Sequence, residues 1–216
     1  MTILGGGADL EKIQGKMGNP YSIIAPGATV KMYPCGSLAQ PTMDALLEVI
    51  KDYDVTPQDV ERIDVRAGPN ILDPLRYEAP EDMLQAKFSL QFGLATILLK
   101  RRAGLREYTD DWVRNPVLRR MMEKVKTIHD DEISGMGVDK MRSILELELI
   151  TGEKIQRIVE TARGTPDNPF APWELDEKFT ECAGYVINKQ RALEAIKIIN
   201  NIETVRSVKE LTRLLS

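Results

Sequence analysis

The chain has 216 residues and a formal net charge of −4 at pH 7, with 29% charged and 43% hydrophobic residues. This balance is typical of a globular protein with an ordinary core, and the negative charge argues against a nucleic-acid-binding surface. The longest apolar stretch, 88–99, is too short to span a bilayer and the first residues lack a secretory signal, so we expect a cytoplasmic protein without membrane partners.

The amino-terminal third begins with a connecting segment. Residues 1–27 are rich in glycine and contain one expected short helix, Asp9–Gly15. β-branched and aromatic residues predict a short strand over Ala28–Tyr33, which Pro34 would end. Apolar residues at helical spacing then predict a helix over Gln40–Tyr53 with one apolar face.

The middle of the chain contains the strongest helix prediction. Glu61–Ala67 alternates apolar and charged residues, which is typical of a half-buried strand, and Gly68–Pro80 is a proline-rich loop. Pro80–Arg102 is predicted as one long helix, because it begins with acidic residues and ends with basic ones. Its centre is apolar nearly all round, so we expect it to be buried.

The next segment contains further strands. Helix-start signals stand at Thr109 and Asn115, and Lys124–His129 alternates again. Met141–Ile150 and Glu153–Ala162 are two alternating runs joined by a turn dipeptide, which predicts a hairpin. The sheet is therefore expected to be mostly antiparallel.

Beyond Gly164 a proline-rich linker leads into helical sequence only. Three helices are expected, over Trp173–Val186, Lys189–Asn201 and Val205–Leu215. A segment this small rarely forms its own core, so it must pack on something else. The predicted fold class is α+β, with a two-layer, mostly antiparallel sheet that carries helices on one face, followed by a short all-helical C-terminal segment. The expected divisions are a lead-in at 1–27, an α+β domain at 28–164 and a helical tail at 165–216.

One group of residues stands out as a candidate site. Lys31, Tyr33, Cys35 and Gly36 join a cation, a phenol and a thiol where the predicted strand breaks into a loop. A lysine in such a place can hold a carboxylate, or act as a base if burial lowers its pKa. The alternative is a solvated lysine beside two structural side chains, and the spacing alone favours that alternative.

Other chemistry-bearing residues give weaker indications. Arg66 and Arg76 flank the proline-rich loop, where they could clamp a polycarboxylate or simply face solvent. His129 is the only histidine and sits in a charged turn, which favours a solvated side chain. Cys35 and Cys182 are far apart without metal-ligand spacing, so we expect reduced thiols and no metal.

Four stretches of the chain resemble elements of the MmgE/PrpD family and occur in the family's order. They are KMYPCGSLAQPTMDALLEV at 31–49, PEDMLQAKFSLQFGLATILL at 80–99, YTDDWVRNPVLRRMMEKVKTIHDDE at 108–132 and NPFAPWELDEKF at 168–179. The corresponding family patterns are K-x-Y-P-C-C-x-x-x-H-P-x-x-D-A, E-A-K-F-S-L-x-Y, F-T-D-x-x-x-x-x-P-x-V-x-x-L-x-x-K-V and N-P-x-x-x-x-E-L-x-x-K-F. Together the four matches are specific, although each alone is not.

The resemblance implies an α+β lid domain that closes over a larger helical domain, with the active site between them and no cofactor. It implies a catalytic role for Lys31 in carboxylate binding or proton transfer, and substrate-binding roles for Tyr33, Cys35 and Gly36. Gln40 stands where the family usually has histidine and can still hydrogen-bond a substrate. Gly36 stands where a second cysteine is common.

The family includes 2-methylcitrate dehydratase, cis-aconitate decarboxylase and iminodisuccinate epimerase. The resemblance therefore implies a lyase of propionate metabolism that dehydrates a small tricarboxylic acid, with decarboxylation and epimerisation as alternatives. The similarity covers the C-terminal portion, whereas the family's catalytic histidines come from its helical domain. A non-catalytic or partner-dependent subunit is thus a further alternative. The expected partners are a polycarboxylate substrate, a helical partner chain and a second copy in a homodimer.

Overall fold

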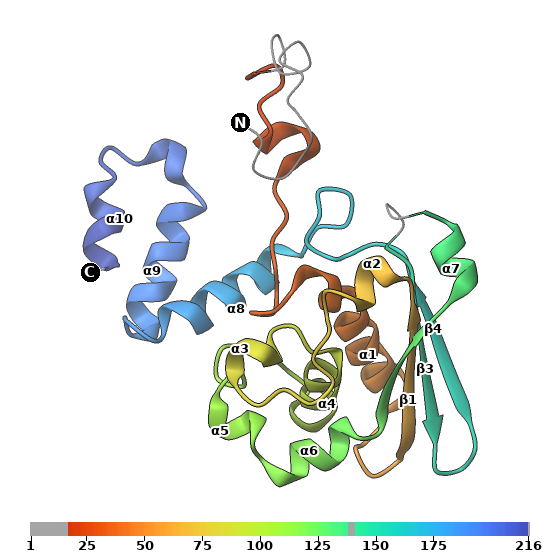
Figure 1. Cartoon of the computed structure of the whole chain (residues 1–216). Coiled ribbons are helices and arrows are strands. Elements are labelled where there is room, and N and C mark those ends of the chain that lie inside the picture. The colour runs from red at the N-terminus through yellow and green to blue at the C-terminus, as the bar shows by residue number, and fades with distance from the viewer. Residues whose placement is uncertain (1–16, 138–140, 216) are drawn as a thin grey trace.

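The computed structural model describes residues 17–137 and 141–215, and the predicted helix Asp9–Gly15 lies outside them. The described residues form an α+β fold, which confirms the predicted class (Figure 1). The strands are β1 (Val60–Ala67), β2 (Val125–His129), β3 (Ser143–Leu149) and β4 (Lys154–Val159). They form a sheet in the order β2-β1-β3-β4, with β1 and β2 parallel and the other two pairings antiparallel. The sheet is therefore mostly antiparallel, and the predicted hairpin is its β3–β4 pair.

The helices form the second layer and the carboxyl-terminal part. They are α1 (Gln40–Tyr53), α2 (Pro69–Leu72), α3 (Met83–Ala86), α4 (Leu90–Lys100), α5 (Asp110–Val113), α6 (Pro116–Met122), α7 (Asp131–Gly135), α8 (Pro172–Ala183), α9 (Lys189–Ile199) and α10 (Lys209–Leu214). Helix α1 packs over β3 and β4, and α4 packs over β2 and against α1 (Figure 1). We call residues 31–163 the body, residues 164–171 the linker and residues 172–215 the helical tail.

The core of the body lies between the sheet and these two helices. Ile63, Val65 and Leu145 point from the strands toward α1 and α4 and are fully buried. The helices approach each other closely at Gly93, where a Cβ atom would lie 2.8 Å from the Met43 sulfur. This close crossing explains a glycine in the middle of a buried helix, despite its low helix propensity.

The opposite face of the sheet carries charged side chains. Arg62 Nη2 lies 2.9 Å from Asp64 Oδ2, and Lys154 Nζ lies 2.9 Å from Glu146 Oε1. These alternate along the strands with the buried apolar residues, so the period of two in the sequence separates core from solvent.

The predicted long helix over Pro80–Arg102 is wrong in one respect, because it is two helices. Helix α3 ends at Ala86, and Ser89 then adopts an extended backbone and caps α4 by accepting a hydrogen bond from the Phe92 N–H at 3.1 Å. A serine cap of this kind starts a new helix instead of continuing the old one. The break leaves a turn at Lys87 that becomes part of the candidate site.

The predicted strand over Ala28–Tyr33 is also wrong. The segment is irregular and forms one backbone hydrogen bond to the linker, from the Val30 N–H to the Gly164 carbonyl at 2.9 Å. A strand needs a ladder of such bonds to a neighbouring strand, and none of the described strands lies beside it. Residues 17–30 instead form an arm that leaves the body (Figure 1).

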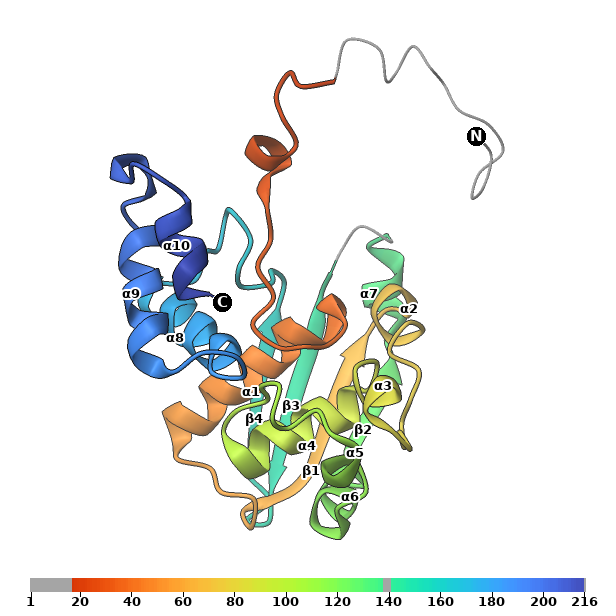
Figure 2. The ribbon, with the colours of Figure 1, turned by 90° about the vertical axis from the view of Figure 1, so that its left-hand side faces the viewer.

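The helical tail has the predicted three helices but little core of its own. Figures 1 and 2 show α9 and α10 standing clear of the sheet, with α8 between them and the body. Helix α8 has no buried residue, whereas α9 buries Ala192, Ala195 and Ile196. Among residues 17–137 and 141–215, no helix has the length and apolar character needed to cross a membrane.

Candidate functional site

An open depression of about 460 Å³ lies where the loop after the arm meets the α3–α4 turn and helix α8. Its lining consists of Lys31, Tyr33, Pro34, Cys35, Gly36, Lys87, Phe88 and Lys178. Four of the five residues that the sequence indicated therefore lie together. The fifth, Gln40, is not part of the lining.

The buried side chain of Gln40 forms hydrogen bonds with the backbone of this loop. This side chain is 4% exposed; Oε1 accepts hydrogen bonds from the Met32 N–H at 2.8 Å and the Tyr33 N–H at 3.4 Å. Its Nε2 donates to the Tyr33 carbonyl at 3.3 Å. An amide that both accepts from and donates to the backbone restrains the loop. In this structure Gln40 therefore positions Lys31 and Tyr33 without lining the depression itself.

Tyr33 fastens the same loop to helix α1. Its hydroxyl donates to Asp44 Oδ1 at 2.7 Å, and both side chains are buried. Burial raises the pKa of the Tyr33 phenol far above its ordinary range, and the neighbouring Asp44 adds to this shift. Burial also raises the pKa of Asp44, against the opposing effects of the Tyr33 hydrogen bond and Arg163. Tyr33 therefore stays protonated and acts as a donor.

Cys35 presents a protonated thiol at neutral pH. Burial raises its pKa to about 11, although the Tyr108 hydroxyl beside it and the Lys31 ammonium oppose the shift. The Cys35 sulfur also lies 3.8 Å from the Met43 sulfur at the edge of the core. Because the thiolate is the nucleophilic form, Cys35 is suited to packing and weak hydrogen bonding rather than to covalent catalysis.

Gly36 brings the loop into direct contact with the α3–α4 turn. Its N–H donates to the Lys87 carbonyl at 2.7 Å, and a Cβ atom at Gly36 would lie 3.2 Å from a Leu75 methyl group. The absence of a side chain allows this approach. Lys87 consequently stands beside the loop that carries Lys31.

Three lysines from distant parts of the sequence line the depression. Lys31 Nζ donates to the Cys35 carbonyl at 3.3 Å, and Lys178 Nζ donates to the Met32 carbonyl at 3.4 Å. Lys87 completes the group. No acidic side chain belongs to the described lining, so the depression favours anionic groups.

Lys87 and Lys178 were missed by the sequence analysis, although a signal for them was present. Each stands at a lysine letter of a quoted family pattern, Lys87 in QAKFSL and Lys178 in ELDEKF. Only the fold reveals that they converge on Lys31.

Helix α8 is held in place by an ion pair one turn before Lys178. Arg163 Nη2 lies 2.7 Å from both carboxylate oxygens of Glu174, and the same carboxylate accepts from the Ala171 N–H at 2.9 Å. The Arg163 guanidinium also stacks on Phe170, with its carbon 4.8 Å from the ring centroid. These contacts fix the start of α8, which aims Lys178 at the loop.

The other candidates of the sequence analysis lie elsewhere. Arg66 Nη1 lies 3.8 Å from Asp130 Oδ2, whereas the Arg76 guanidinium stacks on the Tyr77 ring. The two arginines therefore do not converge on one site. His129 is largely exposed, with Nε2 3.8 Å from an Asp73 oxygen. The described residues bring together no group of three or more His, Cys, Asp or Glu side chains that could hold a metal ion.

The sequence profile of the MmgE/PrpD C-terminal domain matches residues 33–204, which is well over half of the chain. No curated protein is similar enough to the chain to count as a match. The profile spans most of the candidate site, from Tyr33 to Lys178, and the structural elements that carry it. The chain therefore belongs to the MmgE/PrpD family, of which it contains the C-terminal domain.

Proposed function

We propose that the three-lysine depression binds a small polycarboxylate and forms one wall of a lyase site of the 2-methylcitrate dehydratase type. The observation that carries this proposal is the convergence of Lys31, Lys87 and Lys178 on one open depression. A tricarboxylate carries three negative charges, and each ammonium can donate to one or more carboxylate oxygens. Membership of the MmgE/PrpD family supports a reaction of the hydro-lyase kind.

In the proposed dehydration, a base removes a proton from the carbon next to a carboxylate. A carbon–carbon double bond forms as the hydroxyl group on the neighbouring carbon leaves as water, after it gains a proton. Negative charge grows on the carboxylate during this step, so nearby ammonium groups stabilise the transition state more than the ground state. Lys31 is assigned to carboxylate binding or proton transfer, and Lys87 and Lys178 to holding the remaining carboxylates.

A partner-dependent role is the second candidate, and one observation favours it. The described lining contains neither an imidazole nor a carboxylate, and its tyrosine and cysteine both have raised pKa values. A phenol or thiol with a raised pKa donates a proton weakly, and it cannot act as a base near neutral pH because it is already protonated. The base of the reaction is therefore assigned to a helical domain or a helical partner chain that faces the depression. The proton transfer assigned to Lys31 is then the protonation of the leaving hydroxyl group.

Binding tests the first half of the proposal. Citrate is titrated into the purified chain at low ionic strength, with heat as the readout, for the wild type and Lys31→Ala, Lys87→Ala and Lys178→Ala. Each substitution is expected to weaken binding about three- to tenfold, because each removes one charge-assisted hydrogen bond. Lys189→Ala, at the start of α9, is the matched control. Equal loss in the control, or none in the three variants, would mean that citrate binds without the depression.

Activity tests the second half. Dehydration of 2-methylcitrate is followed by the ultraviolet absorbance of the unsaturated product, with the chain alone and with an added helical domain from the family. We expect turnover only in the mixture, and its loss with Lys31→Ala. Robust turnover by the chain alone would remove the need for a partner, and an active Lys31→Ala mixture would remove Lys31 from the mechanism.

A further inference from the structure

A second pocket, of about 210 Å³, lies between α4, α6, β2 and the loop before α3. It shares no lining residue with the three-lysine depression. Its floor is formed by Gln91, Met122 and Val125, which are all buried. The floor is thus apolar except for one amide.

That amide is incompletely satisfied. Gln91 is 3% exposed; its Nε2 donates to Thr127 Oγ1 at 3.5 Å, whereas its Oε1 has no hydrogen-bond partner in the described part of the chain. A buried polar atom without a partner is unfavourable, so a site of this kind favours a molecule that supplies the missing bond. If the amide is turned over, the threonine hydroxyl donates to Oε1 and Nε2 becomes the unpaired atom. In either orientation one polar atom of Gln91 is left for a ligand.

The rim of the pocket carries two charges of each sign. Arg119 and Lys126 supply the cations, and Glu78 and Glu123 supply the carboxylates. An anion alone would meet the two carboxylates, and a cation alone would meet the two basic groups. A small molecule with both an ammonium and a carboxylate group matches this rim best.

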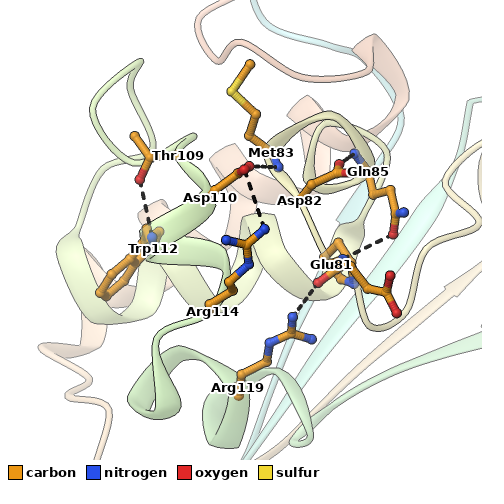
Figure 3. A network of polar contacts seen from close by, with 10 residues as sticks. Glu81, Asp82, Met83, Gln85, Thr109, Asp110, Trp112, Arg114 and Arg119 are labelled. Carbon is orange, nitrogen blue, oxygen red and sulfur yellow. Dashed lines mark hydrogen bonds and ion pairs between the residues drawn. The ribbon is translucent and has the colours of Figure 1, made fainter.

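The wall of the pocket is held in place before any ligand arrives. Arg119 Nη2 donates to the Pro80 carbonyl at 2.6 Å, which ties α6 to the loop that carries Glu78. Figure 3 shows this bond beside a second tie, in which the Met83 N–H donates to Asp110 Oδ1 at 2.8 Å. A pocket whose walls are already fixed loses little entropy on binding.

We propose that this pocket binds a free α-amino acid with a small polar side chain. The carboxylate of the amino acid lies toward Arg119 and Lys126, its ammonium toward the two glutamates, and its side chain reaches the amide of Gln91. Serine and asparagine are suitable probes, because a hydroxyl or carboxamide can donate to or accept from that amide.

The test is a titration of L-serine and L-asparagine into the full chain, followed by nuclear magnetic resonance or calorimetry. Acetate and methylammonium serve as probes with only one charge. We expect saturable binding of an amino acid and much weaker binding of either single-charge probe. Gln91→Leu, which removes both polar atoms at similar volume, is expected to weaken binding about five- to tenfold. Gln156→Leu on the open face of the sheet is the matched control.

Three outcomes would overturn the proposal. They are the absence of saturable amino-acid binding, binding of acetate as strong as that of serine, and Gln91→Leu binding as tightly as Gln156→Leu. A thermal melt of each variant shows whether it is folded. Should Gln91→Leu fail to fold, Lys126→Glu, on the exposed rim, replaces it with the same expected loss.

Discussion

The body and the helical tail differ in what holds them together. The body has a continuous core in which side chains such as Leu46, Ile63 and Leu94 are fully buried. The tail buries few apolar side chains, and α8 meets the body through polar contacts of Arg163 and Lys178. Apolar burial supplies most of a fold's stability, whereas partly exposed polar contacts supply little. The candidate site therefore joins a well-packed region to a region that opens more easily.

This difference bears directly on function. Lys31 and Lys87 belong to the body, but Lys178 belongs to the tail. Regions with few buried contacts open locally at a lower free energy than the whole protein unfolds. The third lysine is therefore present at the site only while α8 stays docked.

The largest effect is expected in the core of the body. Leu94→Ala removes a fully buried side chain from α4 and should lower the free energy of unfolding by about 2 to 5 kcal/mol. Leu193→Ala makes the same change on α9, where the side chain is 40% exposed, and should cost about 1 kcal/mol or less. Urea denaturation measures both values. Equal costs would show that the tail is as well packed as the body.

The next largest effect is expected at the linker. Gly164 has φ of +84°, and a Cβ atom there would overlap the Val30 carbonyl oxygen and the Phe170 ring. Gly152 has φ of +85°, but a Cβ atom there would meet nothing within 4 Å.

Both Gly→Ala changes incur the backbone cost of a positive φ, about 1 kcal/mol. Gly164→Ala should cost about 1 to 3 kcal/mol more, because its neighbours must move. Thermal unfolding of the two variants measures this difference, which reports the steric overlap at Gly164 alone. A Gly164→Ala protein as stable as Gly152→Ala would show that the linker adapts freely.

A smaller, local effect is expected from the ion pair that holds α8. Arg163→Ala should lower the free energy of local opening of residues 172–183 by about 1 to 2 kcal/mol, because it removes a partly buried ion pair in which one guanidinium nitrogen contacts both carboxylate oxygens. Hydrogen exchange should therefore quicken in α8 and stay unchanged in α4. Arg157→Ala, whose pair with Asp52 joins α1 to β4, is the control that should leave α8 unchanged. Faster exchange throughout the chain would contradict a local role.

The next prediction concerns the reactivity of the two cysteines, one in each region. Cys35 is buried in the body with a pKa raised to about 11, whereas Cys182 is exposed on α8. At pH 8 a thiol reagent should label Cys182 at once and Cys35 about a hundredfold more slowly. Cys182→Ser and Cys35→Ser assign the two phases. Rapid labelling of Cys35 in the folded chain would show that the loop opens readily.

The same raised pKa predicts a pH dependence of stability. Folding favours the protonated Cys35 thiol, so its contribution is complete below about pH 9 and is lost as the pH rises toward about 11. The stability difference between the wild type and Cys35→Ala should therefore shrink in that window. A difference that stays constant from pH 8 to pH 11 would contradict the burial of the thiol.

Much of the fold could be predicted because its elements have local causes. The helix over Gln40–Tyr53 has one apolar face, and the β3–β4 hairpin has two alternating runs around a turn, so both predictions are confirmed. The break before Leu90 could not be predicted from the spacing of apolar residues, because the centre of this segment is apolar on nearly all sides. It depends on the Ser89 cap and on the contact between Gly36 and Lys87.

The candidate site was predictable only in part. The loop from Lys31 to Gly36 is contiguous, so its residues could be named from one motif. Lys87 and Lys178 join it through tertiary contacts between segments far apart in the sequence. Position in the sequence also gave no indication that the Gln40 side chain faces the loop backbone.

Hydrogen exchange in α8, measured with and without citrate, tests most directly whether the site is shared between body and tail. Citrate bound by Lys31, Lys87 and Lys178 must favour the docked helix, so exchange over residues 172–183 should slow when citrate is added. The protection should disappear in Lys178→Ala and persist in Lys189→Ala. Citrate binding that leaves exchange in α8 unchanged would contradict a site built from both regions.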